Sequence, residues 1–228
     1  MERKHIFLGV VILIFVIIIC IIIWKVSPQK TSAQRLPDKY QELMEKDENK
    51  KTIKGYTSAV DKDNDGKDDQ TDILLEAIAY INTKPKYKSK YYNTGYPDDG
   101  YGVCTDVVAF ALKGAGYDLK QLVQEDISAN REDYEIQEPD ENIDFRRVKN
   151  LKVYFEHTAI SLTTEISAIE EWQGGDIVIF KKHIGIVSDR RNKNGVPYII
   201  HHNNKRQSSY EQDILEKRKD IVGHYRIS

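Results

Sequence analysis

The stretch Gly100-Tyr101-Gly102-Val103-Cys104-Thr105-Asp106 runs directly into the apolar segment Val107-Val108-Ala109-Phe110-Ala111-Leu112. The glycines predict a turn, and the apolar segment predicts a buried helix whose first turn contains Cys104. Unpaired backbone N–H groups and the positive end of the helix dipole at such a start favour a thiolate over a thiol. The pattern therefore predicts that Cys104 is a nucleophile.

The cysteine count leaves a second interpretation open. The chain has two cysteines, and Cys20 falls within an N-terminal hydrophobic run, so Cys104 has no intramolecular partner outside that run. An unpaired cysteine on an exported domain indicates either a reactive thiol or a buried one. The alternative to a nucleophile is a small buried side chain, because free cysteine often packs as a hydrophobic residue.

The N-terminal run predicts a membrane anchor. Residues 6–24 carry no charge and follow the basic residues Arg3 and Lys4. As a helix rising about 1.5 Å per residue, the run covers most of a bilayer core about 30 Å thick. It ends in isoleucines and Trp24 rather than in the small residues of a cleavage site, so we expect an uncleaved anchor in the cell membrane. The basic residues ahead of it place residues 1–5 in the cytoplasm and the C-terminal part outside the cell.

The rest of the chain divides into a linker and one domain. The polar, proline-containing segment after the anchor predicts an extracellular stalk at residues 25–54. Residues 55–228 are enough for one hydrophobic core and contain no repeat or second linker, so we expect a single domain. The formal net charge is −2 without a long basic block, which argues against a nucleic-acid partner.

An acidic segment at residues 61–72 matches a calcium-binding loop. Oxygen ligands at alternating positions and a glycine at the sixth position, Gly66, suit the sharp turn around a calcium ion. The alternative is a solvated acidic turn that caps the next helix, which the apolar periodicity predicts at residues 71–82. The ligands of such a structural calcium ion would be Asp61, Asp63, Asp65, Asp69 and Asp72, although Asp72 is shorter than the usual glutamate.

Turn-forming residues at 93–100 lead into the cysteine segment. Loops on rigid scaffolds tend to carry function. Tyr96 and Tyr101 are therefore candidates to bind substrate or to donate a hydrogen bond to an oxyanion.

Three apolar segments near the C-terminus, residues 177–180, 183–187 and 197–201, predict successive strands. Short strands behind apolar helices indicate an α+β fold. If the last connecting loop is symmetric about Asn192, His183 lies opposite His201, with Cβ atoms about 4.5–5.5 Å apart. If Asn194-Gly195 forms a tight turn instead, the register shifts and this pairing is lost.

These residues suit acyl transfer by a thiolate. Cys104 would attack, His183 would take its proton, and His201 would fix the tautomer of His183, with His202 as the other candidate for that third role. Backbone N–H groups at the helix start would stabilise the oxyanion. We expect no cofactor in this reaction, because His201-His202 lacks the spacing of a zinc site.

Several blocks in order resemble a known bacterial family, domain of unknown function 1287, from Gly55 to the C-terminus. That family is grouped with NlpC-type, papain-like cysteine peptidases, many of which cut peptide bonds in bacterial cell walls. The blocks are Gly95-Tyr96-Pro97-Asp98-Asp99-Gly100-Tyr101-Gly102-Val103-Cys104-Thr105-Asp106, Asn142-Ile143-Asp144-Phe145-Arg146-Arg147, Gly175-Asp176-Ile177-Val178, His183-Ile184-Gly185-Ile186-Val187 and Gly223-His224-Tyr225-Arg226.

The resemblance implies a papain-like fold at residues 55–228, in which N-terminal helices pack on a small antiparallel sheet. It also implies the nucleophile, base and orienting roles for Cys104, His183 and His201. Typical wall enzymes of that group have Asp before the cysteine and Ser-Gly after it, whereas this chain has Val103 and Thr105-Asp106. An acid two residues beyond a thiolate opposes its ionisation unless a salt bridge or hydrogen bond occupies it.

The sequence thus predicts a membrane-anchored, extracellular cysteine hydrolase that cleaves an amide bond, with the stem peptides of peptidoglycan as the expected substrate. Two alternatives stay open. One is a catalytically silent papain-fold module that binds the cell wall, and the other is a thiol acyltransferase.

Overall fold

The computed structural model describes residues 53–228. The predicted cytoplasmic segment at 1–5, the anchor at 6–24 and nearly all of the stalk at 25–54 lie outside the described residues. Among the helices of residues 53–228, none combines the length and apolar content of a membrane span.

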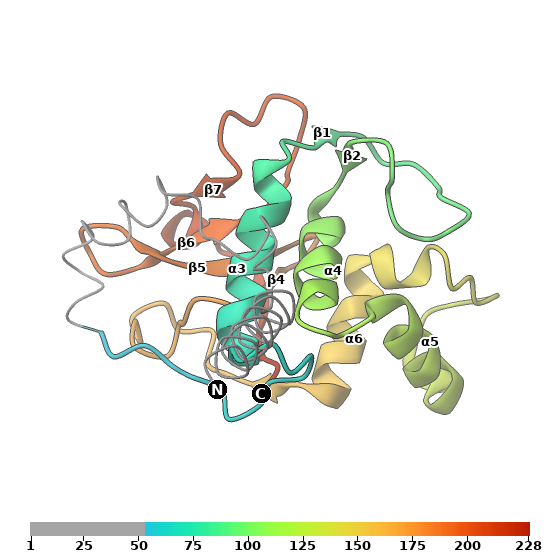
Figure 1. Cartoon of the computed structure of the whole chain (residues 1–228), viewed down its shortest axis with the longest axis horizontal. Helices are drawn as coiled ribbons and strands as arrows, with labels where there is room; N and C mark the ends of the chain where they lie inside the picture. The colour runs from blue at the N-terminus through green and yellow to red at the C-terminus, as the bar shows by residue number, and fades with distance from the viewer. Residues whose placement is uncertain (1–52) are drawn as a thin grey trace, which may run out of the picture. The chain divides into compact units, whose positions relative to one another are not determined.

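The described residues form an α+β fold, as the sequence predicts (Figure 1). Helices precede most of the sheet along the chain, and short 3-10 turns lie between the longer elements. The α-helices are α3 (Asp69–Asn82), α4 (Cys104–Gly114), α5 (Leu119–Ala129) and α6 (Val148–Thr158). The strands are β1 (Lys86–Tyr87), β2 (Tyr101–Gly102), β3 (Ile160–Ser161), β4 (Ile177–Phe180), β5 (His183–Arg191), β6 (Pro197–Ile200), β7 (Glu211–Gln212) and β8 (Ile221–Arg226). The 3-10 turns are η3 (Arg131–Asp133), η4 (Asp144–Arg146) and η5 (Leu215–Lys217).

Six strands form one sheet in the order β3-β8-β4-β5-β6-β7, and every neighbouring pair is antiparallel. The short strands β1 and β2 form a separate parallel pair immediately before the cysteine helix. This pair joins the segment after α3 to the segment before α4, so it fixes the approach of the chain to Cys104.

Helix α4 packs against both α3 and strand β5, with Val107, Val108 and Leu112 buried. The same core contains Ile184 and Ile186 of β5. Alternate residues of the sheet belong to a second core on the opposite face, because successive strand residues point in opposite directions. That second core contains Trp172, Val178, Phe180, Val187, Val196, Ile199 and Leu215. Both faces of the sheet are therefore covered.

The helix boundaries follow local sequence signals. Asp68 caps α3 by accepting a hydrogen bond from the backbone N–H of Thr71, so the helix begins at Asp69, two residues before the predicted start. Helix α5 spans residues 119–129, and Asp118 caps it by accepting a hydrogen bond from the Lys120 backbone N–H. Gly116, with φ of +86°, ends the preceding helical segment because it adopts the left-handed conformation without strain.

The predicted strands are confirmed, but neither predicted register between β5 and β6 is the observed one. Ile186 pairs with Ile200 and Val187 with Ile199. One step further, this register places His201 opposite Gly185, two residues from His183. A bulge between Val187 and Arg191 shifts the register. The prediction assumed that the two strands pair symmetrically about the loop, and a bulge breaks this symmetry.

Gly185 is required by close packing against β6. A Cβ atom at this position would lie 2.7 Å from Ile199 Cγ2, 2.8 Å from the Ile200 carbonyl oxygen and 3.2 Å from His201 Cβ. The absence of a side chain lets His201 lean across Gly185 toward His183.

We expect Gly185→Ala to lower the free energy of unfolding by about 1–3 kcal/mol, because overpacking displaces β6. Urea unfolding of the full-length chain measures the change. Gly55→Ala is the matched control, since a Cβ atom there meets nothing within 4 Å. Equal stability of the two variants would contradict the packing argument.

Candidate active site

Cys104 is the first residue of α4. The chain reaches it through Gly100, whose φ is +74°, and through Val103, which is extended and occupies the N-cap position. The side chain of Cys104 is partly exposed and packs at the edge of the main core. The structure therefore places the thiol at a helix start, as the sequence predicts.

The thiol is nevertheless protonated at neutral pH. Burial raises the pKa of Cys104 to about 11, and the charge of Asp106 adds to the rise. The backbone N–H groups of Ile184, Thr105 and Cys104 point to the sulfur and act in the opposite direction. Desolvation thus outweighs the helix start, and the sequence-based expectation of a resting thiolate is wrong.

A buried ion pair holds the acid that follows Cys104. Arg146 donates from Nε to Asp106 Oδ1 at 2.6 Å and from a terminal nitrogen to Oδ2 at 2.9 Å, and both side chains are almost fully buried. Asp106 Oδ2 also accepts the Val103 N–H at 2.8 Å, which caps the helix. Thr105 donates to the Arg146 carbonyl oxygen. The two residues after Cys104 that depart from the typical wall-enzyme pattern, Thr105 and Asp106, therefore both bind Arg146.

We expect Arg146→Gln to destabilise the chain by about 3–5 kcal/mol, because it leaves the Asp106 carboxylate buried and unpaired. Thermal or urea unfolding of the full-length chain measures the loss. Arg147→Gln is the control, since the neighbouring Arg147 side chain is 53% exposed and its loss should change stability by no more than about 0.5 kcal/mol. The double variant Asp106→Asn/Arg146→Gln should recover part of the stability, and no recovery would contradict the unpaired-charge explanation.

A chain of three side chains runs across the sheet beside Cys104. His183 Nε2 lies 2.8 Å from His201 Nδ1, and His201 Nε2 lies 2.9 Å from Gln212 Oε1. The amide oxygen of Gln212 can only accept, so His201 carries its proton on Nε2 and accepts on Nδ1. His183 therefore donates from Nε2, which leaves its Nδ1 atom as the basic nitrogen.

Both imidazoles are neutral. Burial lowers the pKa of His183 to about 3, and the proximity of the His201 ring and of the Arg218 guanidinium acts in the same direction. Burial also lowers the pKa of His201 to about 4, against the hydrogen bond to Gln212. Among the described residues, Nδ1 of His183 has no hydrogen-bond partner.

The sulfur and the base come from adjacent points of the fold. The Cys104 sulfur lies against the backbone N–H of Ile184, the residue directly after His183. No hydrogen bond joins the sulfur to the His183 ring within residues 53–228. The resting site is thus a neutral thiol next to a neutral imidazole, and hydrogen bonds of this kind often tighten only when substrate is bound.

The raised pKa of Cys104 predicts how its alkylation depends on pH. We expect the rate of labelling by iodoacetamide to rise about tenfold per pH unit between about pH 6 and 9, because only the thiolate reacts. Mass spectrometry of the Cys104 peptide from the full-length chain measures the rate, and Cys20 is followed on its own peptide. A rate that is constant across this range would show a thiolate at neutral pH and contradict the account.

The remaining candidate residues fall in different places. Tyr96 donates to Asp118 at 2.8 Å and packs on Phe110 and Phe145, so its hydroxyl serves the fold. Tyr101 lines a cavity next to the cysteine segment. His202 makes no hydrogen bond to His183 among the described residues, whereas His201 does, so His201 occupies the position expected of the third residue.

The acidic loop before α3 has one compact group of carboxylates. Ligand atoms of Asp61, Asp63 and Asp65 lie within 4.8 Å of one another. Asp69 accepts hydrogen bonds from the Lys62 N–H and the Tyr117 hydroxyl, and Asp72 pairs with the Lys67 ammonium at 3.0 Å. The calcium ion stays a prediction. Asp61, Asp63 and Asp65 precede the helix, and Asp65 also pairs with Lys67. The alternative helix-capping role belongs to Asp68.

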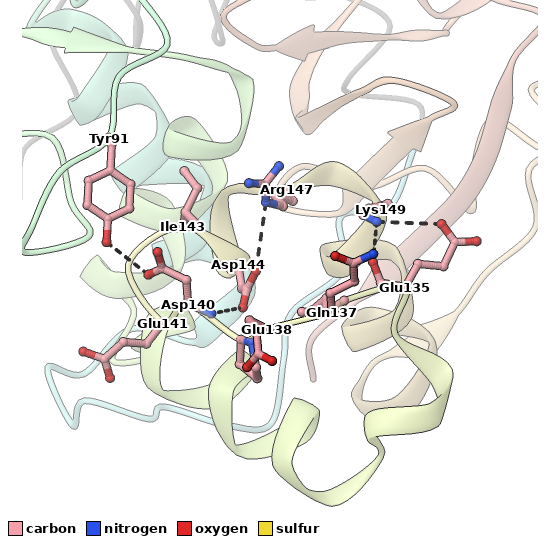
Figure 2. A pocket seen from close by; sticks show the side chains of 12 residues that line it. Tyr91, Glu135, Gln137, Glu138, Asp140, Glu141, Ile143, Asp144, Arg147 and Lys149 are labelled. Carbon is pink, nitrogen blue, oxygen red and sulfur yellow. Dashed lines mark hydrogen bonds and ion pairs between the residues drawn. The ribbon is translucent and has the colours of Figure 1, made fainter.

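A cavity of about 800 Å³ lies away from this site. Figure 2 shows that its walls come from Tyr91 and the segment at 135–149. Its charged side chains are engaged with each other: Asp144 approaches Arg147, and Lys149 pairs with Glu135 (Figure 2). None of Cys104, His183 and His201 lines it, so size does not identify the reactive site.

A second buried ionic cluster fixes the opposite end of the sheet. Asp176 accepts two hydrogen bonds from Arg226 and one from His224 Nε2, all between 2.7 and 2.9 Å. His224 also donates from Nδ1 to the Thr163 carbonyl oxygen and stacks on Trp172, with ring centroids 3.8 Å apart. These buried contacts indicate that the segments at residues 175–178 and 223–226 stabilise the fold.

Sequence reasoning missed Gln212 and the role of Arg146. Gln212 lies on a two-residue strand with no apolar pattern, so its sequence carries no signal. Arg146 follows a buried phenylalanine, and its burial against Asp106 becomes visible only in three dimensions. The one signal that could have indicated a basic partner elsewhere in the chain was Asp106, an acid at a helix start without an evident partner nearby in the sequence.

The fold and the site define an α+β protein with a cysteine at a helix start and a buried histidine pair on the adjoining sheet. The chain belongs to the family described as "Domain of unknown function (DUF1287)", whose model matches residues 74–227. It is also similar to the Uncharacterized protein YijF of Escherichia coli (strain K12), with 37% identity over 151 residues that cover 62% of this chain and 72% of that protein. No solved structure shows a significant match.

Proposed function

We propose that the protein is an NlpC-like, papain-like cysteine hydrolase, held on the outer side of the cell membrane by residues 6–24 and acting on amide bonds in the stem peptides of peptidoglycan. The observation that carries the proposal is the directed hydrogen-bond chain from Gln212 through His201 to His183. This chain leaves Nδ1 of His183 as the basic nitrogen. His183 directly precedes Ile184, whose backbone N–H contacts the Cys104 sulfur.

In the proposed reaction the proton moves as the bond forms, because neither group is ionised at rest. The Cys104 sulfur attacks the substrate carbonyl carbon while His183 Nδ1 takes the thiol proton. The backbone N–H groups at the start of α4 face the developing oxyanion. His183 then returns the proton to the leaving amine, and a thioester to Cys104 remains.

Water completes the cycle. His183 Nδ1 takes a proton from the attacking water molecule, the carbon–sulfur bond breaks, and the proton goes to the Cys104 sulfur. The product is a carboxylic acid. His201 stabilises the imidazolium that forms twice in the cycle, and Gln212 keeps His201 in the tautomer that can accept from His183.

A second candidate is a catalytically silent binding module at the cell wall. Two observations favour it: the raised pKa of Cys104, and the lack of a hydrogen bond between its sulfur and His183 within the described residues. In this case Cys104→Ser would leave the function intact.

We expect the full-length chain to release peptide fragments from digested peptidoglycan, detected by mass spectrometry. Cys104→Ser should abolish release, and His183→Gln should lower its rate about 10²- to 10⁴-fold, because the general base is lost. Gln212→Leu should lower the rate by up to about tenfold, because it removes the hydrogen bond between His201 and Gln212.

Gln121→Leu is the matched control, because Gln121 is exposed on α5 away from the site. No fragment from the wild-type chain, or equal release by Cys104→Ser, would contradict the hydrolase and favour the binding module. A product joined to an added amine would assign the thioester to an acyltransferase instead.

A further inference from the structure

A second cavity, of about 370 Å³, adjoins the cysteine segment. Its walls come from the β1–β2 pair and from the connection between β6 and β7. The residues that line it include Lys86, Tyr87, Tyr101, His202, Lys205 and Tyr210. Its volume lies at the lower end of the range of small-molecule sites.

An unsatisfied polar atom lies in the wall of this cavity. His202 is only 2% exposed, and its Nδ1 atom is buried without a hydrogen-bond partner. Its ring packs edge-on against Tyr87 at 5.2 Å and Tyr210 at 5.1 Å between centroids. A ligand that gives this atom a hydrogen bond would offset the cost of burying it without a partner.

The charged side chains that line the cavity are basic. No acidic side chain lines it, whereas Lys86 and Lys205 do. Lys88 adds to the positive charge, because its ammonium lies 5.3 Å from the centre of the Tyr101 ring. An anion flanked by aromatic surface fits this wall, since the lysines neutralise the charge and the tyrosines cover apolar parts.

The cavity is close to the reactive sulfur. The β1–β2 pairing places Tyr87 opposite Gly102, two residues before Cys104. Tyr101 precedes Cys104 by three residues on the strand that leads to it. The cavity therefore adjoins the segment that carries the proposed nucleophile.

We propose that this cavity is the subsite that anchors a free carboxylate of the peptide substrate, with the Lys86 and Lys205 ammonium groups and the His202 ring as its partners. The subsite rests on the proposed function for its link to hydrolysis. Binding itself does not require Cys104 to react, so the two can be tested apart.

Binding is measured by calorimetry on the full-length Cys104→Ala variant, which cannot form a thioester. The probes are N-acetyl-Ala-Ala-Ala with a free C-terminal carboxylate and the same peptide as its C-terminal amide. We expect the carboxylate form to bind at least tenfold more tightly. Lys205→Gln and His202→Phe should each remove most of this preference.

Lys193→Gln is the matched control, because Lys193 is an exposed lysine in the β5–β6 loop away from the cavity. Lys205 is itself exposed, so its variant keeps the test valid if His202→Phe does not fold. Equal affinity for acid and amide, or the same loss in Lys193→Gln, would overturn the subsite. Inorganic phosphate that binds as tightly as the carboxylate peptide would also overturn it.

Carboxylate-dependent binding without any hydrolysis by the wild-type chain would support the subsite and reject the hydrolase. Hydrolysis of peptidoglycan fragments without a preference for the carboxylate peptide in binding would support the hydrolase and reject the subsite. The two proposals therefore fail on different results.

Discussion

The buried pair between Asp106 and Arg146 connects the start of α4 with the loop after β1 and with η4. The Asp106 carboxylate caps α4 through the Val103 N–H and binds Arg146 with both oxygens. Arg146 reaches across to the Lys90 carbonyl oxygen in the loop after β1, and its own carbonyl accepts from Thr105. One acid two residues beyond Cys104 thus orients the helix start, the preceding loop and the turn at η4. Such a buried charge is costly without its partner, which makes the arrangement specific.

The sheet contributes a rigid partner to this helix start. Its far end is held by Asp176, His224 and Arg226, while β5 delivers Ile184 to the Cys104 sulfur and His183 to the histidine chain. Because these contacts are buried, they also keep the histidines neutral and the thiol protonated. The same burial that fixes the geometry therefore selects a neutral pair over a preformed ion pair, and any chemistry at this site has to move its proton during attack.

Local signals in the sequence were sufficient for several elements but not for their alignment. Apolar periodicity predicted α3, the apolar segment after Cys104 predicted α4, and apolar runs predicted β4, β5 and β6. The bulge in β5 changed the register, so His201 meets His183 across Gly185 instead of directly opposite it. A bulge depends on packing between strands, which no count of loop residues contains.

The candidate site shows the same division. Cys104, His183 and His201 carry residue types and spacings that can be read from one chain, and the structure places them in one region. Gln212 on its short strand and Arg146 at the end of η4 act through contacts with residues more than ten positions away in the sequence, and no local pattern marks them. The helix dipole predicted a thiolate, yet desolvation decides the pKa, and desolvation depends on the whole fold.

The protonation of the histidine chain is the central claim, and nitrogen NMR of imidazole-labelled protein tests it most directly. The account predicts that His183 and His201 both carry their proton on Nε2 at neutral pH, with a scalar coupling from His183 Nε2 to His201 Nδ1 across the hydrogen bond. Gln212→Leu should weaken the preference of His201 for that tautomer. A proton on Nδ1 of His183 would leave no base for the thiol of Cys104 and would contradict the account.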